Sequence, residues 1–96
     1  MQVVLIIQAE GLENKEVFEK HLKKEGFEKV PEEDFAYEGN TTTHLFSTRA
    51  FIHEVVEKGL KKSGFKGCKI IFEVGTNPME AYLFNQENNM FEQVAV

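Results

Sequence analysis

One corner of the sequence carries residue types that could recognise an anion. Arg49 is the only arginine in a chain with ten lysines, and it falls near the start of a predicted helix, where a cation is electrostatically disfavoured. Arginine offers a planar, bidentate fork that suits a carboxylate or a phosphate. Four further polar residues lie at the same strand–helix junction or on the first helical turn, namely Thr48, Ser47, His53 and His44. Because helix N-termini bind anions, the sequence predicts a ligand-binding anion corner here. The alternative is an ordinary N-cap by Ser47 or Thr48, with a surface ion pair from Arg49 to a nearby glutamate.

The remaining reactive side chains form no recognisable catalytic or metal-binding pattern. His44 and His53 are nine residues apart on different predicted elements, and no third ligand stands at a suitable spacing. Cys68 has no specified basic or acidic partner and is expected to be a small buried apolar residue. Asp34, the only aspartate, lies in a polar connector. The sequence also lacks a glycine-rich phosphate loop, a nucleophile elbow and an HExxH motif. We therefore predict no catalytic residue, no metal and no cofactor.

A repeated segment indicates which elements position these residues. Glu16–Phe27 (EVFEKHLKKEGF) and Glu54–Phe65 (EVVEKGLKKSGF) are identical at nine of twelve aligned positions, 38 residues apart. Each copy has apolar residues at helical spacing, two lysines in its last turn and a glycine that ends the helix. Such self-similarity is typical of a duplicated supersecondary unit. The predicted helices run over Asn14–Glu25 and Thr48–Ser63.

Strand patterns surround both predicted helices. Val3–Gln8 is a continuous β-branched run typical of a strand buried on both faces. Phe35–Glu38 and Thr41–Thr48 are predicted to form a hairpin about Gly39-Asn40, and Lys69–Val74 alternates like a further strand. The order strand, helix, strand, strand, helix, strand predicts an α+β, ferredoxin-like split β-α-β (βαββαβ) fold. Both helices would cover one face of an antiparallel sheet.

The length of the chain predicts a single domain over residues 1–96, with the two copies near residues 3–38 and 41–74. Residues 79–96 form a C-terminal extension. Ala81–Phe84 and Met90–Val96 favour two strands about a polar turn, and a short helix beginning at Pro78 is the alternative.

An excess of apolar residues on the sheet predicts that the chain associates with itself. Val3–Ile7 is apolar on both faces of its strand, and Ile71 points away from the helix-facing set of its own strand. The second face of an antiparallel sheet is normally polar, and large exposed apolar patches are rare on soluble monomers. We expect the C-terminal hairpin, a second copy of the chain, or both to cover this face, which predicts a homodimer.

Charge and composition exclude several classes of function. The net charge is −5, from sixteen acidic and eleven basic residues, which argues against general nucleic-acid binding. The single Cys68 cannot form an intrachain disulfide. The longest apolar run is too short for a membrane span or for a signal sequence. These features predict a cytoplasmic protein without a membrane segment.

The predicted order of elements, with its additional C-terminal strand, is similar to that of the small CRISPR-associated Cas2 proteins and the related VapD ribonucleases. In that group the first strand characteristically ends in an aspartate held at the dimer axis, whereas here it ends in Gln8-Ala9-Glu10. The resemblance implies a nucleic-acid-processing enzyme as the alternative function. The favoured hypothesis is a small non-enzymatic homodimeric binding or regulatory module, whose ligand is a partner protein or a small anion.

Overall fold

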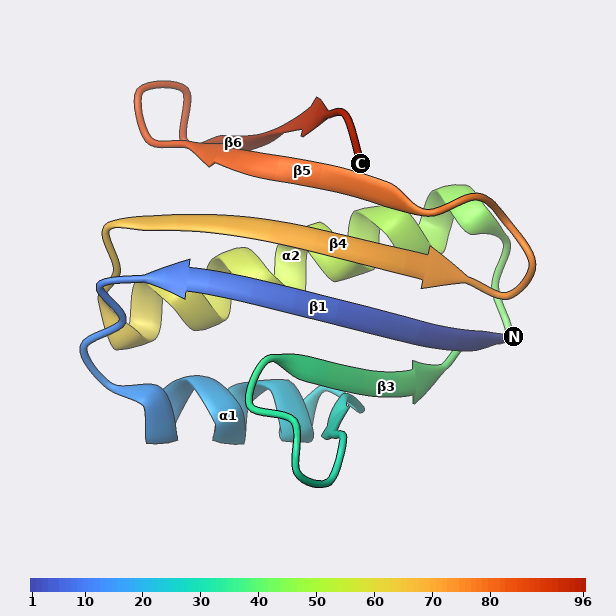
Figure 1. The fold of residues 1–96 in the computed structure, drawn as a ribbon, viewed down its shortest axis with the longest axis horizontal. Coiled ribbons are helices and arrows are strands. Elements are labelled where there is room, and N and C mark those ends of the chain that lie inside the picture. The colour runs from blue at the N-terminus through green and yellow to red at the C-terminus, as the bar shows by residue number, and fades with distance from the viewer.

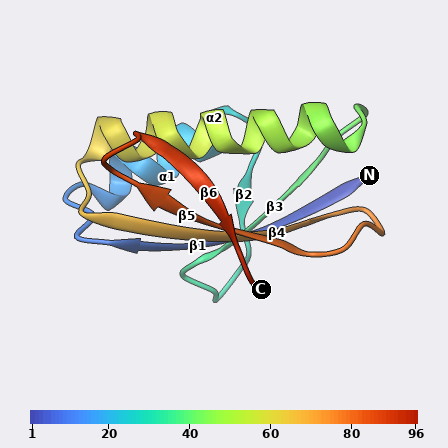
Figure 2. The same ribbon diagram turned by 90° about the horizontal axis from the view of Figure 1, so that it is seen from above.

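The computed structural model describes all 96 residues, Met1–Val96. Six strands form one sheet, and two helices cover one face of it (Figure 1, Figure 2). The elements in chain order are β1 (Gln2–Glu10), α1 (Lys15–Lys24), β2 (Glu28–Lys29), β3 (Ala36–Asn40), α2 (Leu45–Ser63), β4 (Gly67–Val74), β5 (Glu80–Asn85) and β6 (Met90–Val94). All neighbouring strands are antiparallel, in the order β2-β3-β1-β4-β5-β6. This α+β architecture is consistent with a ferredoxin-like arrangement.

Helix α1 begins and ends where local signals in the sequence predict. The side chain of Asn14 caps its N-terminus, because Oδ1 accepts a hydrogen bond from the backbone N–H of Val17 at 3.2 Å. After the helix, Gly26 adopts a φ of +98°, a conformation that side chains with a Cβ rarely take. The chain then folds back, and the buried Phe27 donates its backbone N–H to the carbonyl of Leu22 at 2.9 Å. The prediction of this helix is confirmed.

Helix α2 begins at Leu45, three residues before the predicted start, and the strand predicted over Thr41–Thr48 does not form. The threonines of this segment bond to each other instead. The hydroxyl of Thr41 accepts the backbone N–H of Thr43 at 3.1 Å, and the hydroxyls of Thr41, Thr43 and Thr48 lie 2.9 Å from one another. Side-chain bonds of this kind stabilise a local turn in competition with a strand. The β-branched run therefore leads into the helix and does not return through the sheet.

The predicted turn at Gly39-Asn40 is also wrong, since β3 continues through both residues and pairs with β1 at Val3↔Gly39. The other neighbour of β3 is the short strand β2. A Cβ at Gly39 would lie 3.0 Å from the carbonyl oxygen of Gly26 and 3.3 Å from the ring of Phe27. Gly39 therefore allows the segment after α1 to approach β3 closely, which is a common role of glycine inside a strand.

The two helices contact each other closely at Gly59 of α2. A Cβ at this position would lie 3.0 Å from the ring of His21 and 3.1 Å from the ring of Phe18, both on α1. The buried imidazole of His21 reaches across the interface, and its Nε2–H donates to the backbone carbonyl of Val55 at 3.0 Å. Its Nδ1 lies 3.3 Å from Nζ of Lys62 and accepts from it. His21 is therefore a structural residue that joins the two helices.

The core lies between the helices and one face of the sheet. Every second residue of β1 and β4 is buried against the helices, and these residues are Val3, Leu5, Ile7, Cys68, Ile70, Phe72 and Val74. The intervening residues Val4, Ile6 and Ile71 are only half-buried. The first strand is predicted to be buried on both faces; within a single chain it is buried on the face toward the helices and half-buried on the other.

The C-terminal extension forms the two predicted strands, and it lengthens the sheet without covering the second face. β5 pairs with β4, and β6 pairs with β5. β6 begins on the helix side of the sheet and ends, with the C-terminus, on the opposite side (Figure 2). Near its beginning the ring of Phe91 lies 5.4 Å from that of His53 on α2 and 5.1 Å from that of Phe84. The face opposite the helices, named the open face below, has no helix over it, although Ala81 on this face is fully buried.

Candidate functional site

Arg49 is bound by a carboxylate of its own chain. Its Nε–H donates to Oε1 of Glu80 at 2.6 Å, and its Nη2 donates to Oε2 at 3.0 Å, which is the bidentate geometry expected of a guanidinium. Glu80 is the first residue of β5 and is 8% exposed. The ring of Phe46 lies 5.3 Å from the guanidinium carbon and contributes a cation–π contact. The alternative predicted for Arg49, a surface ion pair to a nearby glutamate, is therefore met in part: the partner is a glutamate, but a nearly buried one that lies 31 residues away.

Tyr82 completes the bonding of this carboxylate. Residues 80 and 82 lie on the same face of β5, and the hydroxyl of Tyr82 donates to Oε1 of Glu80 at 2.6 Å. The hydrogen bonds from Arg49 hold the pKa of Glu80 below its usual value, although burial acts in the opposite direction. Burial, together with the hydrogen bond to Glu80, raises the pKa of Tyr82 to about 12. The cluster therefore holds an ionised carboxylate, a guanidinium and a neutral phenol.

His53 lies beside this cluster but makes no hydrogen bond through its buried Nε2. Its ring is surrounded by aromatic side chains, with centroids 4.3 Å from Tyr82, 5.4 Å from Phe91 and 6.1 Å from Phe72. Burial lowers the pKa of His53, and the charge of Arg49 adds to this effect, whereas the nearby carboxylates of Glu80 and Glu57 oppose it. His53 is thus held as a neutral aromatic ring between α2 and the C-terminal hairpin.

The other three predicted site residues lie elsewhere. Thr48 is buried and bonds to the hydroxyls of Thr41 and Thr43. Oγ of Ser47 lies 3.4 Å from Nε2 of His44 on the protein surface. The N-cap of α2 is His44, which makes no capping hydrogen bond through its side chain, so neither Ser47 nor Thr48 caps the helix as predicted. The five predicted residues are therefore divided among three places, with only Arg49 and His53 near the same carboxylate.

Glu80 occupies the Nε/Nη2 edge of Arg49, so an anion binding at this edge would have to displace a buried carboxylate that accepts three hydrogen bonds, two from Arg49 and one from Tyr82. The anion corner therefore stays a prediction for the remaining N–H groups of Arg49, whose side chain is 27% exposed. Glu80 and Tyr82 are not among the residues predicted from the sequence. Their spacing of two residues in a predicted strand places both on one face, and this was the only local signal. Nothing local connects them to Arg49, which is 31 residues from Glu80.

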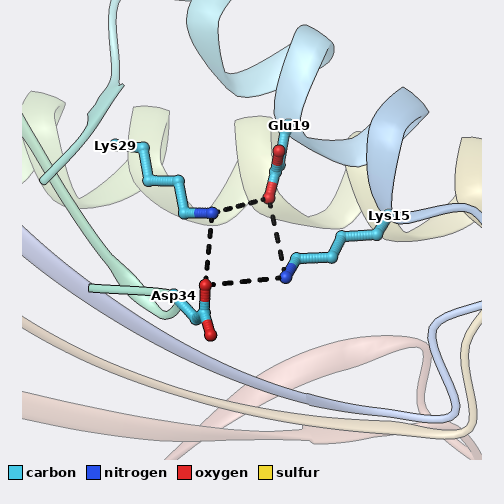
Figure 3. Close-up of polar contacts among 4 residues, drawn as sticks. All are labelled: Lys15, Glu19, Lys29 and Asp34. Atoms are coloured by element: carbon cyan, nitrogen blue, oxygen red, sulfur yellow. Dashed lines mark hydrogen bonds and ion pairs between the residues drawn. The ribbon is translucent and has the colours of Figure 1, made fainter. Parts of the chain in front are cut away.

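A second group of charges lies at the surface between α1 and the loop before β3 (Figure 3). Lys29 contacts Glu19 at 3.2 Å and Asp34 at 3.5 Å, and Lys15 lies 3.9 Å from each of the same two carboxylates. The side chain of Asp34 is 69% exposed. Exposed pairs of this kind contribute little stability. The only aspartate of the chain therefore belongs to a solvated ring of ion pairs that links the loop to α1.

The open face carries one continuous apolar row. The strand register places five residues side by side across five strands, and the order across the sheet is Ala36, Ile6, Ile71, Ala81, Val94. On one side of this row Val4 lies between Glu38 and Glu73. On the other side the order is Gln8, Lys69, Leu83, Glu92. The open face is thus an apolar band with charged side chains on both of its borders.

Comparison with known proteins adds no functional assignment. No protein-family model matches the chain, and no match was found among curated proteins or solved structures. No three His, Cys, Asp or Glu side chains are grouped so that they could hold a metal ion. Neither helix has both the length and the apolar character that crossing a membrane requires.

Proposed function

We propose that this chain is a small non-enzymatic binding module that acts as a homodimer, and that a second copy of the chain docks on the open face. The observation that carries this proposal is the apolar row from Ala36 to Val94 on the open face, which no helix covers. Ala81 is buried and the other four residues of the row are half-buried, so the apolar surface that a partner could cover comes from these four and from the exposed Leu83 beside them. We further propose that the first four strands and both helices form a ferredoxin-like βαββαβ unit, and that the module acts in the cytoplasm, where the buried thiol of Cys68 stays reduced.

The proposal does not depend on a small anionic ligand, since the only arginine is already paired. It predicts that sedimentation or light scattering will give twice the chain mass of 11.0 kDa at micromolar concentration. Ile71→Glu places a charge in the middle of the apolar row and should give the monomer mass, because burying an unpaired carboxylate is costly. Phe46→Glu is the matched control, since Phe46 is 75% exposed on α2 and far from the open face. A wild-type mass of 11.0 kDa at every concentration would overturn the proposal.

The ribonuclease alternative is supported by the order of elements and by the C-terminal strands. It lacks the aspartate at the end of the first strand, where β1 ends in Gln8, Ala9 and Glu10. If Glu10 takes the place of that aspartate, purified wild-type protein should cleave RNA and Glu10→Gln should not. Absence of cleavage by the wild type in the presence of divalent cations would remove this alternative.

A further inference from the structure

The charges that border the apolar row are arranged so that the open face complements itself. Lys69 and Glu73 lie on β4, two residues before and two residues after Ile71, and all three side chains point to the open face. On β4, one border of the row therefore carries the carboxylate of Glu73, and the other carries the ammonium group of Lys69. A strand advances about 3.4 Å per residue, so each charge lies roughly 7 Å along the strand from Ile71.

The way in which two such faces can meet is limited by symmetry. Two copies related by a two-fold axis present the same surface to each other, and packed sheets lie about 10 Å apart. If the axis runs along the apolar row, β4 lies over its own copy in the opposite direction, and the borders of the row are exchanged. Lys69 then faces the partner's Glu73, and Glu73 faces the partner's Lys69. If the axis runs along the strands midway between β1 and β4 instead, Lys69 faces the partner's Gln8 and Glu73 faces the partner's Val4. If it runs along β4, each charge faces the same charge of the partner, so neither arrangement pairs unlike charges.

Two exposed apolar residues, Leu83 on β5 and Met79 just before it, favour the same axis. Leu83 follows Ala81 by two residues and is 49% exposed, and Met79 precedes Ala81 by two residues and is 44% exposed. An axis along the row brings Leu83 over the partner's Met79. Two large apolar side chains that are exposed in one chain would then cover each other in the dimer, together with the residues of the row.

We infer that two copies of the chain stack through their open faces about an axis along the apolar row, with Ile71 at its centre and two ion pairs between Lys69 and the partner's Glu73. This inference rests on the proposed homodimer and specifies its register. Charge complementarity of this kind fixes the register and excludes other orientations, because unlike charges meet in only one of them.

The test is a charge exchange across the axis. Lys69→Glu brings two pairs of carboxylates together, and Glu73→Lys brings two pairs of ammonium groups together. Each variant should weaken dimerisation by roughly 10- to 100-fold, measured as the dissociation constant by sedimentation velocity at low salt. The double variant Lys69→Glu/Glu73→Lys restores both ion pairs with their signs exchanged and should return to within about threefold of the wild type. Lys24→Glu, an exposed position on α1, is the control with the same net charge as Lys69→Glu.

The outcomes separate this inference from the proposed homodimer. A wild-type chain that stays monomeric overturns both. A wild-type dimer that both single variants leave unchanged overturns the register alone and points to the other axis. Single variants that weaken the dimer, with no recovery in the double variant, also overturn the register, since the two charges then act at separate places. Lys69 and Glu73 are outside the core, so each variant is expected to stay folded. Thermal unfolding of each variant checks this.

Discussion

The bonds around Glu80 allow a quantitative prediction for the removal of Arg49. Glu80 is nearly buried, since its side chain is 10% exposed, and the side chain of Arg49 is 27% exposed. Breaking a fully buried ion pair by removing one partner costs about 3–5 kcal/mol, because the remaining charge is uncompensated. Since Arg49 is partly exposed, we expect Arg49→Met to lower the free energy of unfolding by about 3 kcal/mol, near the lower end of that range. For a domain of this size that corresponds to a fall in melting temperature of roughly 12 °C or more.

A double-mutant cycle isolates the pair. Glu80→Gln alone keeps an acceptor for the hydroxyl of Tyr82 and should cost about 1.5 kcal/mol. In the double variant no buried carboxylate is left unpaired, so we expect a total cost of about 3 kcal/mol and a coupling energy of about 1.5 kcal/mol. Urea unfolding at pH 7 measures each value. Lys58→Met is the matched control, because it removes an exposed ion pair to Glu54, and it should leave the free energy of unfolding nearly unchanged.

The pH dependence provides a second measurement of the same pair. Arg49 lowers the pKa of Glu80, so the stability that the pair contributes is complete above the ordinary value of 4.5 and is lost as the pH falls through the lowered pKa. The difference in stability between the wild type and Arg49→Met should therefore shrink between pH 5 and the acidic end of the titration. Two results would refute this reasoning: single-variant costs that simply add in the double variant, or a difference that stays constant as the pH falls.

Three further predictions concern buried groups. His53→Phe removes a buried nitrogen without a partner and should raise the free energy of unfolding at pH 7 by about 1 kcal/mol. Burial also lowers the pKa of His53, so wild-type stability should fall as the pH drops below 6.5, and pH-dependent urea unfolding should show a smaller fall in the variant. Gly59→Ala should lower the free energy of unfolding by about 1–2 kcal/mol, because the new methyl group meets the rings of His21 and Phe18. This cost outweighs the higher helix propensity of alanine, and thermal unfolding measures the net effect. Burial raises the pKa of Cys68 to about 12, so a thiol reagent at pH 8 should react with the native chain much more slowly than with the chain in urea.

The parts of the fold that depend on neighbouring residues could be predicted from the sequence. Helix α1 has its cap at Asn14 and its glycine at Gly26, and both act within a few residues. The alternation in β4 likewise separates Ile70 and Phe72 from Ile71 without knowledge of the sheet. In each case the physical cause lies in the segment itself, so the sequence pattern contains the information.

The parts that failed depend on contacts between distant segments. The sequence pattern predicts a turn at Gly39, but a glycine is needed there because the chain after α1 passes close to it. The threonines before α2 have strand propensity, and their hydroxyls bond to each other only once the helix has placed Thr48 beside Thr41. Arg49 was recognised as unusual, but its partner Glu80 lies on a strand that is brought beside α2 by the pairing of β5 with β4.

The close contact at Gly59 has a consequence for the repeat. Gly59 and His21 occupy equivalent positions of the two copies, and so do Val56 and Phe18. Position 59 faces its equivalent, position 21, across the contact between the two helices, so the two side chains share one space. Two imidazoles would overlap, and two glycines would leave a hole where the ring of His21 now lies. A chain with the same residue at both positions could therefore not pack these helices at their present distance.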